Sequence, residues 1–177
     1  MREVEVKILE VNVPELRKKL PSLGAKKIFS GKVTSKPFDF PDGRLKKNNE
    51  PLRVRQIGKT VEVVHKSAPE EVKGFKIRKE TETTVADFDT MCKIFENIGL
   101  EQVCHSEKIR ESYRLGNIRF DIDQYPKIPA YLEVEAEDEK EVEKGVKMLG
   151  FRMDQTTASA SKAILKKYGV HVNDLRF

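Results

Sequence analysis

The chain has 177 residues, of which 34 are Lys or Arg and 29 are Asp or Glu, so its net charge of +5 is a small difference between two large, interleaved populations. A nucleic-acid binder would instead gather its basic residues into a patch with few acids among them, and no apolar run approaches the ~18 residues of a membrane span. These numbers predict one domain over residues 1–177 that is cytoplasmic and has neither nucleic acid nor membrane as a partner.

The first predicted strand reads EVEVKI, over residues 3–8. Successive side chains on a strand point to opposite faces, so Glu3, Glu5 and Lys7 share one face while the intervening valines and Ile8 share the other. Taken alone, this pattern favours an ordinary antiparallel sheet with one solvent-exposed face.

Four segments show helical spacing of their apolar residues, over 12–25, 86–100, 138–151 and 159–169. The first has Asn12 as its expected N-cap and Pro14 in its first turn. Pro21 should kink this helix or end it early. Together the helices carry enough apolar surface to cover one face of a sheet.

Six further strands alternate as the first one does. Their charged faces carry, in chain order, Arg53 and Arg55; Glu62 and Lys66; Lys76, Arg78, Glu80 and Glu82; Lys108 and Arg110; Arg119, Asp121 and Asp123; and Glu133 and Glu135. Solvent faces normally also contain much Thr, Ser and Gln. A sheet closed on itself, with the charged face inward and the apolar face under external helices, is therefore the alternative to a solvent-exposed sheet.

The residue types indicate what such a lumen would bind. Buried charges without partners are costly, so a charged lumen needs a charged guest. Arginine guanidinium groups bind phosphate oxygens in bidentate fashion, and several bases converging from different strands suit a polyphosphate. The carboxylates would bind Mg²⁺ or Mn²⁺, which in turn bind phosphate oxygens.

The ordered set of charged pairs, from Glu3-x-Glu5-x-Lys7 to Glu133-x-Glu135, resembles the CYTH superfamily over residues 3 to about 137. This family of triphosphate tunnel enzymes includes class IV adenylate cyclases, thiamine triphosphatases and inorganic triphosphatases. The resemblance implies an α+β fold, with an eight-stranded antiparallel β-barrel that forms a closed tunnel with a charged interior and helices packed outside. It also implies a triphosphate substrate and Mg²⁺ or Mn²⁺ as cofactor.

The resemblance assigns roles to individual residues. The metal ligands are expected to be Glu3, Glu5, Asp123, Glu133 and Glu135. The substrate-binding residues are expected to be Arg53, Arg55, Lys66, Arg78, Lys108 and Arg110. Lys7, Arg53 and Lys66 are expected to take part in catalysis, and Glu80, Glu82 and Asp121 to support the other site residues.

The expected substrate is ATP, thiamine triphosphate or tripolyphosphate, bound by a monomer or homodimer. Water attack on the terminal phosphate would make the protein a triphosphatase, whereas attack by the ribose 3′-hydroxyl of ATP would make it an adenylate cyclase. Residues 125–135 lack the glycine-rich turn of the bacterial cyclases, which favours hydrolysis. A non-catalytic module that binds nucleotide or polyphosphate is the further alternative. Tyr113 and Tyr125 could stack on a base, although packing is the commoner role of such aromatics.

Overall fold

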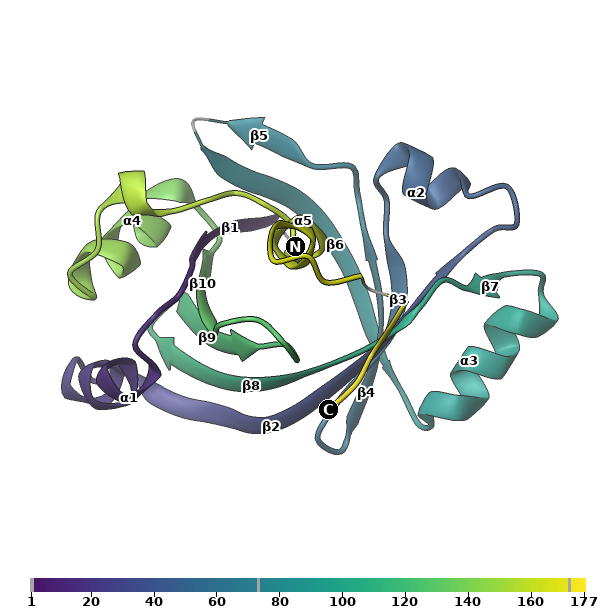
Figure 1. Cartoon of the computed structure of the whole chain (residues 1–177), viewed down its shortest axis with the longest axis horizontal. Helices are drawn as coiled ribbons and strands as arrows, with labels where there is room; N and C mark the ends of the chain where they lie inside the picture. Colours follow the sequence, from purple (N-terminus) through teal and green to yellow (C-terminus); the bar gives the residue numbers. More distant parts are fainter. Residues whose placement is uncertain (1, 73, 172) are drawn as a thin grey trace.

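The computed structural model describes residues 2–72, 74–171 and 173–177 and contains a closed ring of eight antiparallel strands (Figure 1). The ring follows the order β2, β8, β9, β10, β1, β6, β4, β3, and β3 pairs back with β2. Its strands are β1 (Arg2–Ile8), β2 (Lys26–Asp39), β3 (Leu52–Ile57), β4 (Thr60–Lys66), β6 (Phe75–Val85), β8 (His105–Leu115), β9 (Ile118–Gln124) and β10 (Tyr131–Ala136). The expected eight-stranded barrel is confirmed.

Shorter elements complete the fold. The helices are α1 (Val13–Ser22), α2 (Arg44–Asn48), α3 (Phe88–Asn97), α4 (Glu139–Met148) and α5 (Ser161–Lys167), and a 3₁₀ turn covers Met153–Gln155. The short strands β5 (Glu70–Val72), β7 (Glu101–Gln102) and β11 (Asp174–Leu175) extend the sheet beside β6, β2 and β8. Within the described ranges, no helix is long and apolar enough to cross a bilayer.

The apolar face of the barrel points outward and packs under helices, as the alternation predicts. On one side, Val4, Val6 and Val134 are fully buried together with Leu20 of α1 and Val146 of α4. A second cluster joins α3 to the outer faces of β2, β3 and β4. Since the apolar positions of each strand are used on the outside, the charged positions line the interior.

The helix caps agree with the sequence. Asn12, Asp87 and Asp138 each accept a hydrogen bond from the backbone N–H three residues later, at the starts of α1, α3 and α4. Helix α1 ends at Ser22, one residue after Pro21, so the proline lies in the last turn as expected.

Residues 41–51 read PDGRLKKNNEP, a composition that predicts a loop, but the segment contains a helix. Residues 41–51 include α2, which starts after Gly43 at φ 68°. Asp39 at the end of β2 accepts hydrogen bonds from the backbone N–H groups of Phe40, Leu45 and Lys46, and these three bonds hold the turn. The hydrogen bonds to Asp39 explain why a helix forms here. A helix of five residues is too short to show a recognisable periodicity in the sequence, so it could not be predicted from spacing.

Figure 1 shows helix α5 end-on, within the outline of the ring and beside β1 and β6, and residues of α5 line the cavity of the barrel. Its Ser161 hydroxyl is 3.1 Å from the Tyr131 hydroxyl of β10, and Ile164 and Leu165 pack beside Tyr131 and Ile128. The segment before α5 is tied to β1, where Lys7 and Thr157 exchange backbone hydrogen bonds of 2.9 and 2.8 Å. An opening of the barrel lies beside the β8–β9 turn.

Candidate active site

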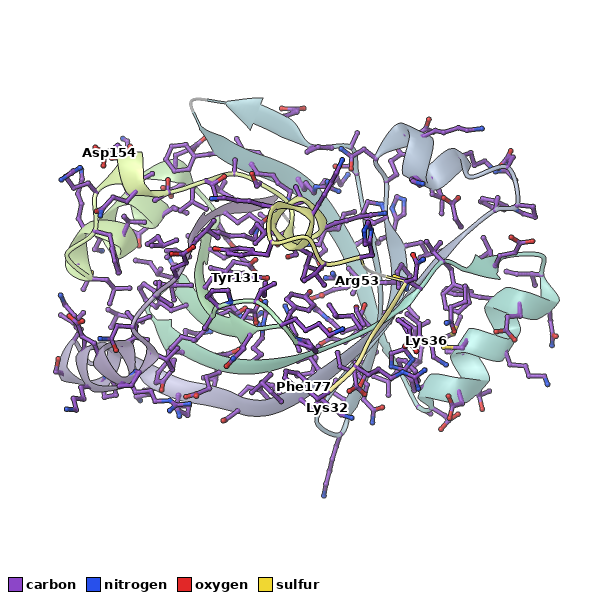
Figure 2. The ribbon with its side chains drawn as sticks, in the orientation of Figure 1. Lys32, Lys36, Arg53, Tyr131, Asp154 and Phe177 are labelled. Atoms are coloured by element: carbon purple, nitrogen blue, oxygen red, sulfur yellow. The ribbon has the colours of Figure 1, made fainter. Side chains whose placement is uncertain are left out.

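The interior of the barrel holds a cavity of about 1360 Å³. It is lined by every residue that the sequence assigned to the site except Asp121 and Asp123, which are 1% and 0% exposed and lie behind the lining. In Figure 2, Arg53 and Tyr131 lie on opposite sides of the ring, whereas Lys32 and Asp154 lie outside it. The structure therefore brings the predicted site residues together around one cavity.

The acidic residues gather on β1, β9 and β10. Carboxylate oxygens of Glu3, Glu5 and Glu135 lie within 4.8 Å of one another, and those of Asp121, Glu133 and Glu135 form a second such group. Oxygen ligands at this spacing suit Mg²⁺ or Mn²⁺. Glu135 belongs to both groups, so a cation held by either would contact it.

The electrostatics of these groups also favour a cation. Burial, together with Glu3 and Glu133, raises the pKa of Glu135 to about 8. Burial also raises the pKa of Glu3, against the lowering effect of Lys66. Glu135 forms no ion pair within the described part of the chain. The other four carboxylates of the two groups each contact a lysine or an arginine, so Glu135 is the one that lacks a paired positive charge among the described residues, and a divalent metal would supply it.

Lys7 sits between two of these carboxylates. Its Nζ is 2.9 Å from Glu5 and 3.0 Å from Glu133, and the residue is 1% exposed. Burial lowers the pKa of this ammonium, but the two carboxylates outweigh burial and raise it. Burial and Glu133 act to raise the pKa of Glu5, but Lys7 and Lys76 outweigh them and lower it to about 2. Lys7 is therefore a fixed positive charge and not a proton acceptor at neutral pH.

Arg110 is the centre of the most buried ion cluster. Its guanidinium donates two 2.6 Å hydrogen bonds to Asp123, reaches Glu133 at 3.2 Å and lies 2.5 Å from Asp121 Oδ2. Lys108 contacts Asp123 at 2.7 Å, and burial and Arg110 lower the pKa of Lys108 to about 8. Both oxygens of Asp123 are therefore held by bases.

This cluster bears on the expected metal ligands. Asp123 belongs to neither carboxylate group found among the described residues, whereas Asp121 belongs to the second group. Asp121 was expected only to support other residues, and Asp123 to bind metal. The metal role of Asp123 remains a prediction, and the geometry favours Asp121 for it.

The basic wall lies on β3 and β4, and β3 is diametrically opposite β10 in the strand order. Arg55 donates to Glu62 at 2.7 Å, and Lys66 contacts Glu3 and Glu80 at 2.6 and 2.9 Å. Arg53 differs, because its buried Nε has no hydrogen-bond partner among the described residues. Burial and the neighbouring Arg55 lower the pKa of Arg53.

Arg78 has a different environment from the other expected substrate-binding residues. Its guanidinium donates to the backbone oxygens of Asn49 and Ser67 and to the side-chain oxygen of Asn49. It thereby ties the segment after α2 to β6. A substrate role for Arg78 stays a prediction, but three of its contacts serve the wall of the cavity.

The cavity also contains bases that the sequence assignment omitted. Lys76 forms an ion pair with Glu5, Arg119 donates to Asp121 at 3.1 Å, and Arg114 lines the opening beside the β8–β9 turn. The strand alternation placed Lys76 and Arg119 on the charged face, so the signal was present. Of the two tyrosines, Tyr125 lines the cavity, whereas Tyr113 is buried on the outer face beside Lys27.

The raised pKa of Glu135 predicts that the stability of the protein depends on pH. Because the pKa of Glu135 rises from 4.5 to about 8 on folding, the folded protein keeps a proton that the unfolded chain loses between these values. We expect the contribution of Glu135 to lower the stability of the metal-free protein as the pH rises from 4.5 to about 8, and Mg²⁺ to restore it. Melting temperatures against pH, with and without Mg²⁺, would measure this.

The matched variants for this experiment are Glu135→Gln and Glu143→Gln. Glu135→Gln should flatten the pH dependence and reduce the response to Mg²⁺. Glu143 is a partly exposed carboxylate on α4 that pairs with Lys147, and its change should leave the pH dependence and the response to Mg²⁺ unaltered. A Glu135→Gln profile that matches the unmodified protein would contradict the raised pKa.

A closed β-barrel whose lumen carries grouped carboxylates together with converging arginine and lysine side chains defines the class of triphosphate tunnel proteins. Residues 1–162 match the CYTH domain, and the chain belongs to the CYTH domain family. It is 33% identical over 134 residues to a protein of Methanocaldococcus jannaschii that is named "putative adenylate cyclase", with 75% of this chain and 74% of that protein covered.

Solved structures show the same fold at low sequence identity. A "putative adenylate cyclase" from Vibrio parahaemolyticus superposes with a TM-score of 0.81 at 19% identity, covering 93% of this chain and 97% of that chain. A protein of Hippeastrum, described as a "putative adenylyl cyclase" with a dominant triphosphatase activity, gives a TM-score of 0.67 at 18% identity, with 96% and 97% covered.

Proposed function

We propose that the protein is a metal-dependent triphosphatase that hydrolyses a triphosphate bound inside the barrel. Two features of the lumen carry the proposal. Two groups of carboxylate oxygens lie on β1, β9 and β10, and across the ring on β3 the buried Nε of Arg53 has no hydrogen-bond partner among the described residues. Membership of the CYTH family supports an enzyme of this kind. A module that only bound phosphate would need the basic wall alone.

The residues that line the cavity would have distinct roles in this reaction. Arg53, Arg55, Lys66 and Lys108 would hold phosphate oxygens by charge-assisted hydrogen bonds. Glu3, Glu5 and Glu135, with Asp121 and Glu133 beside them, would hold Mg²⁺ or Mn²⁺. When bound, the metal would neutralise charge that develops on the phosphate oxygens. Lys7 would keep Glu5 and Glu133 ionised and fixed in position.

Adenylate cyclisation is the second candidate. The named relative from Methanocaldococcus jannaschii supports it, and Tyr125 offers an aromatic surface inside a cavity large enough for a nucleotide. Hydrolysis is favoured because residues 125–135 lack a glycine-rich turn.

A product assay separates the candidates. Purified protein is incubated with ATP, tripolyphosphate or thiamine triphosphate and with Mg²⁺ or Mn²⁺, and the products are resolved by phosphorus NMR. We expect orthophosphate from at least one substrate. Pyrophosphate together with cyclic AMP would identify a cyclase, and binding without turnover would identify a binding module.

Arg53→Met tests the phosphate clamp within the same assay. Since Arg53 forms no ion pair with the described residues, its removal leaves no carboxylate unpaired. We expect triphosphate affinity to fall roughly 10- to 100-fold, the value of one or two charge-assisted hydrogen bonds, and monophosphate affinity to fall much less. Lys32→Met, on the outer face, is the control. Equal losses for both ligands would contradict a triphosphate clamp.

A further inference from the structure

On the inner face of the barrel, charged residues of neighbouring strands are paired by charge, and two places depart from this pairing. Directly opposite residues on neighbouring strands are mostly of opposite charge. Such pairs are Glu3 with Arg78, Glu5 with Lys76, Lys7 with Glu133, Arg55 with Glu62, Lys66 with Glu80, Arg110 with Asp123, and Glu135 with Arg119. Opposite charges in this position stabilise a sheet, and like charges destabilise it.

The first exception is acidic. Glu5 lies opposite Glu135, and Glu133 lies opposite Asp121. These four residues belong to the two carboxylate groups that suit a metal ion. At this place, the departure from charge pairing coincides with a site for a ligand of the opposite sign.

The second exception is basic and lies at the opening beside the β8–β9 turn. Lys26 of β2 lies opposite Arg114 of β8, and Arg114 lies opposite Arg119 of β9. We call these three residues the mouth row. Directly opposite side chains start about 5 Å apart, so three cations stand side by side with no acid between them. Lys26 and Arg114 form no ion pair within the described ranges, and Arg119 has Asp121.

The mouth row is connected to the central site. Arg114 and Arg119 line the same cavity as the phosphate-clamp residues Arg53 and Lys108. Arg114 is six residues beyond the clamp residue Lys108 on β8, which is roughly 20 Å along the strand. A single phosphate group held by Lys108 therefore does not reach Arg114.

We propose that the mouth row is a second phosphate-binding site, separate from the central clamp. It would take phosphate groups that extend beyond a centrally bound triphosphate, either as further units of a linear polyphosphate or as orthophosphate leaving through this opening. The proposal rests on the proposed function for the identity of the central ligand. The unusual register of bases opposite bases favours an anion at this place whatever the central reaction is.

The test uses the double variant Lys26→Gln/Arg114→Gln, which leaves the Arg119–Asp121 contact in place. Its control is Lys93→Gln/Lys140→Gln, which removes the same net charge from exposed positions on α3 and α4. Binding of tripolyphosphate and of a size-fractionated longer polyphosphate is measured by calorimetry with Mg²⁺. Inhibition by orthophosphate is measured with whichever substrate turns over.

We expect the mouth variant to bind the longer polyphosphate about tenfold more weakly, or to be about tenfold less sensitive to orthophosphate, while tripolyphosphate binding stays within twofold. A loss for the longer chain would identify substrate as the ligand, and a loss of orthophosphate inhibition would identify product. If neither polyphosphate binding nor orthophosphate inhibition changes, or if the control variant changes equally, the proposal that the mouth row binds phosphate is wrong. If tripolyphosphate fails to bind the unmodified protein, the proposed function fails, and calorimetry with the longer chain and orthophosphate still reports on the mouth row.

Discussion

Glu5→Gln is expected to reduce metal-dependent turnover at least ~100-fold while the protein stays folded. Glu5 contributes to the carboxylate group with Glu3 and Glu135, and the amide that replaces it is a neutral and weaker ligand. Removing a residue that only hydrogen-bonds to a metal ligand lowers metal affinity or activity 10- to 100-fold, so removing a direct ligand should lower it at least as much. Lys7 keeps its contact with Glu133, so the change leaves this buried ammonium paired.

The measurement is turnover as a function of Mg²⁺ concentration, with circular dichroism as a check on folding. Glu107→Gln is the matched control, because Glu107 is also a buried carboxylate paired with a lysine but lies on the outer face. It should leave the metal dependence unchanged. If the Glu5→Gln variant keeps full turnover at limiting Mg²⁺, Glu5 is not a metal ligand.

Arg110→Ala is expected to lower the free energy of unfolding by about 3–5 kcal/mol, the usual cost of removing one partner from a buried ion cluster. Arg110 is 4% exposed and contacts Asp121, Asp123 and Glu133, which are themselves almost completely buried. Each carboxylate would keep one base, which is Lys108 for Asp123, Arg119 for Asp121 and Lys7 for Glu133. These bases already use donors on their present contacts, so they would not replace the hydrogen bonds that Arg110 donates.

Urea denaturation of the metal-free protein measures this loss. Arg17→Ala is the comparison, since Arg17 also pairs with a carboxylate, Glu111, but has an exposed side chain and should cost no more than about 1 kcal/mol. A loss at Arg110 as small as the loss at Arg17 would show that Arg110 is not the support of the acidic residues.

The sequence was sufficient for the strands and for the side of each strand that faces inward. Alternation of charge and apolar residues has a period of two, and a one-residue error would have reversed every face. Family resemblance supplied the number of strands, since alternation alone left a solvent-exposed sheet open as an alternative.

The sequence was insufficient to predict which charged side chains contact one another when they come from strands that are distant along the chain. Asp121 and Asp123 are two residues apart and lie on the same side of β9, so the sequence does not distinguish their roles. The register of β9 against β8 and β10 shows that Asp123 is held by Lys108 and Arg110. For the same reason, the mouth row is invisible along the chain, because Lys26 is far in sequence from Arg114.

The closed strand order has a consequence for how the protein folds. The ring closes only when β2 pairs with β8, which joins Lys26 to Arg114 and Ser35 to Ser106 across a long stretch of intervening chain. Pairings of this kind give a high contact order, and proteins dominated by them fold in milliseconds to seconds. The pairing of β1 with β10 joins residues still farther apart in the chain. Until the ring is complete, the charged inner face remains open to water, so the dehydration of its ions is expected to occur late, on the native side of the rate-limiting barrier.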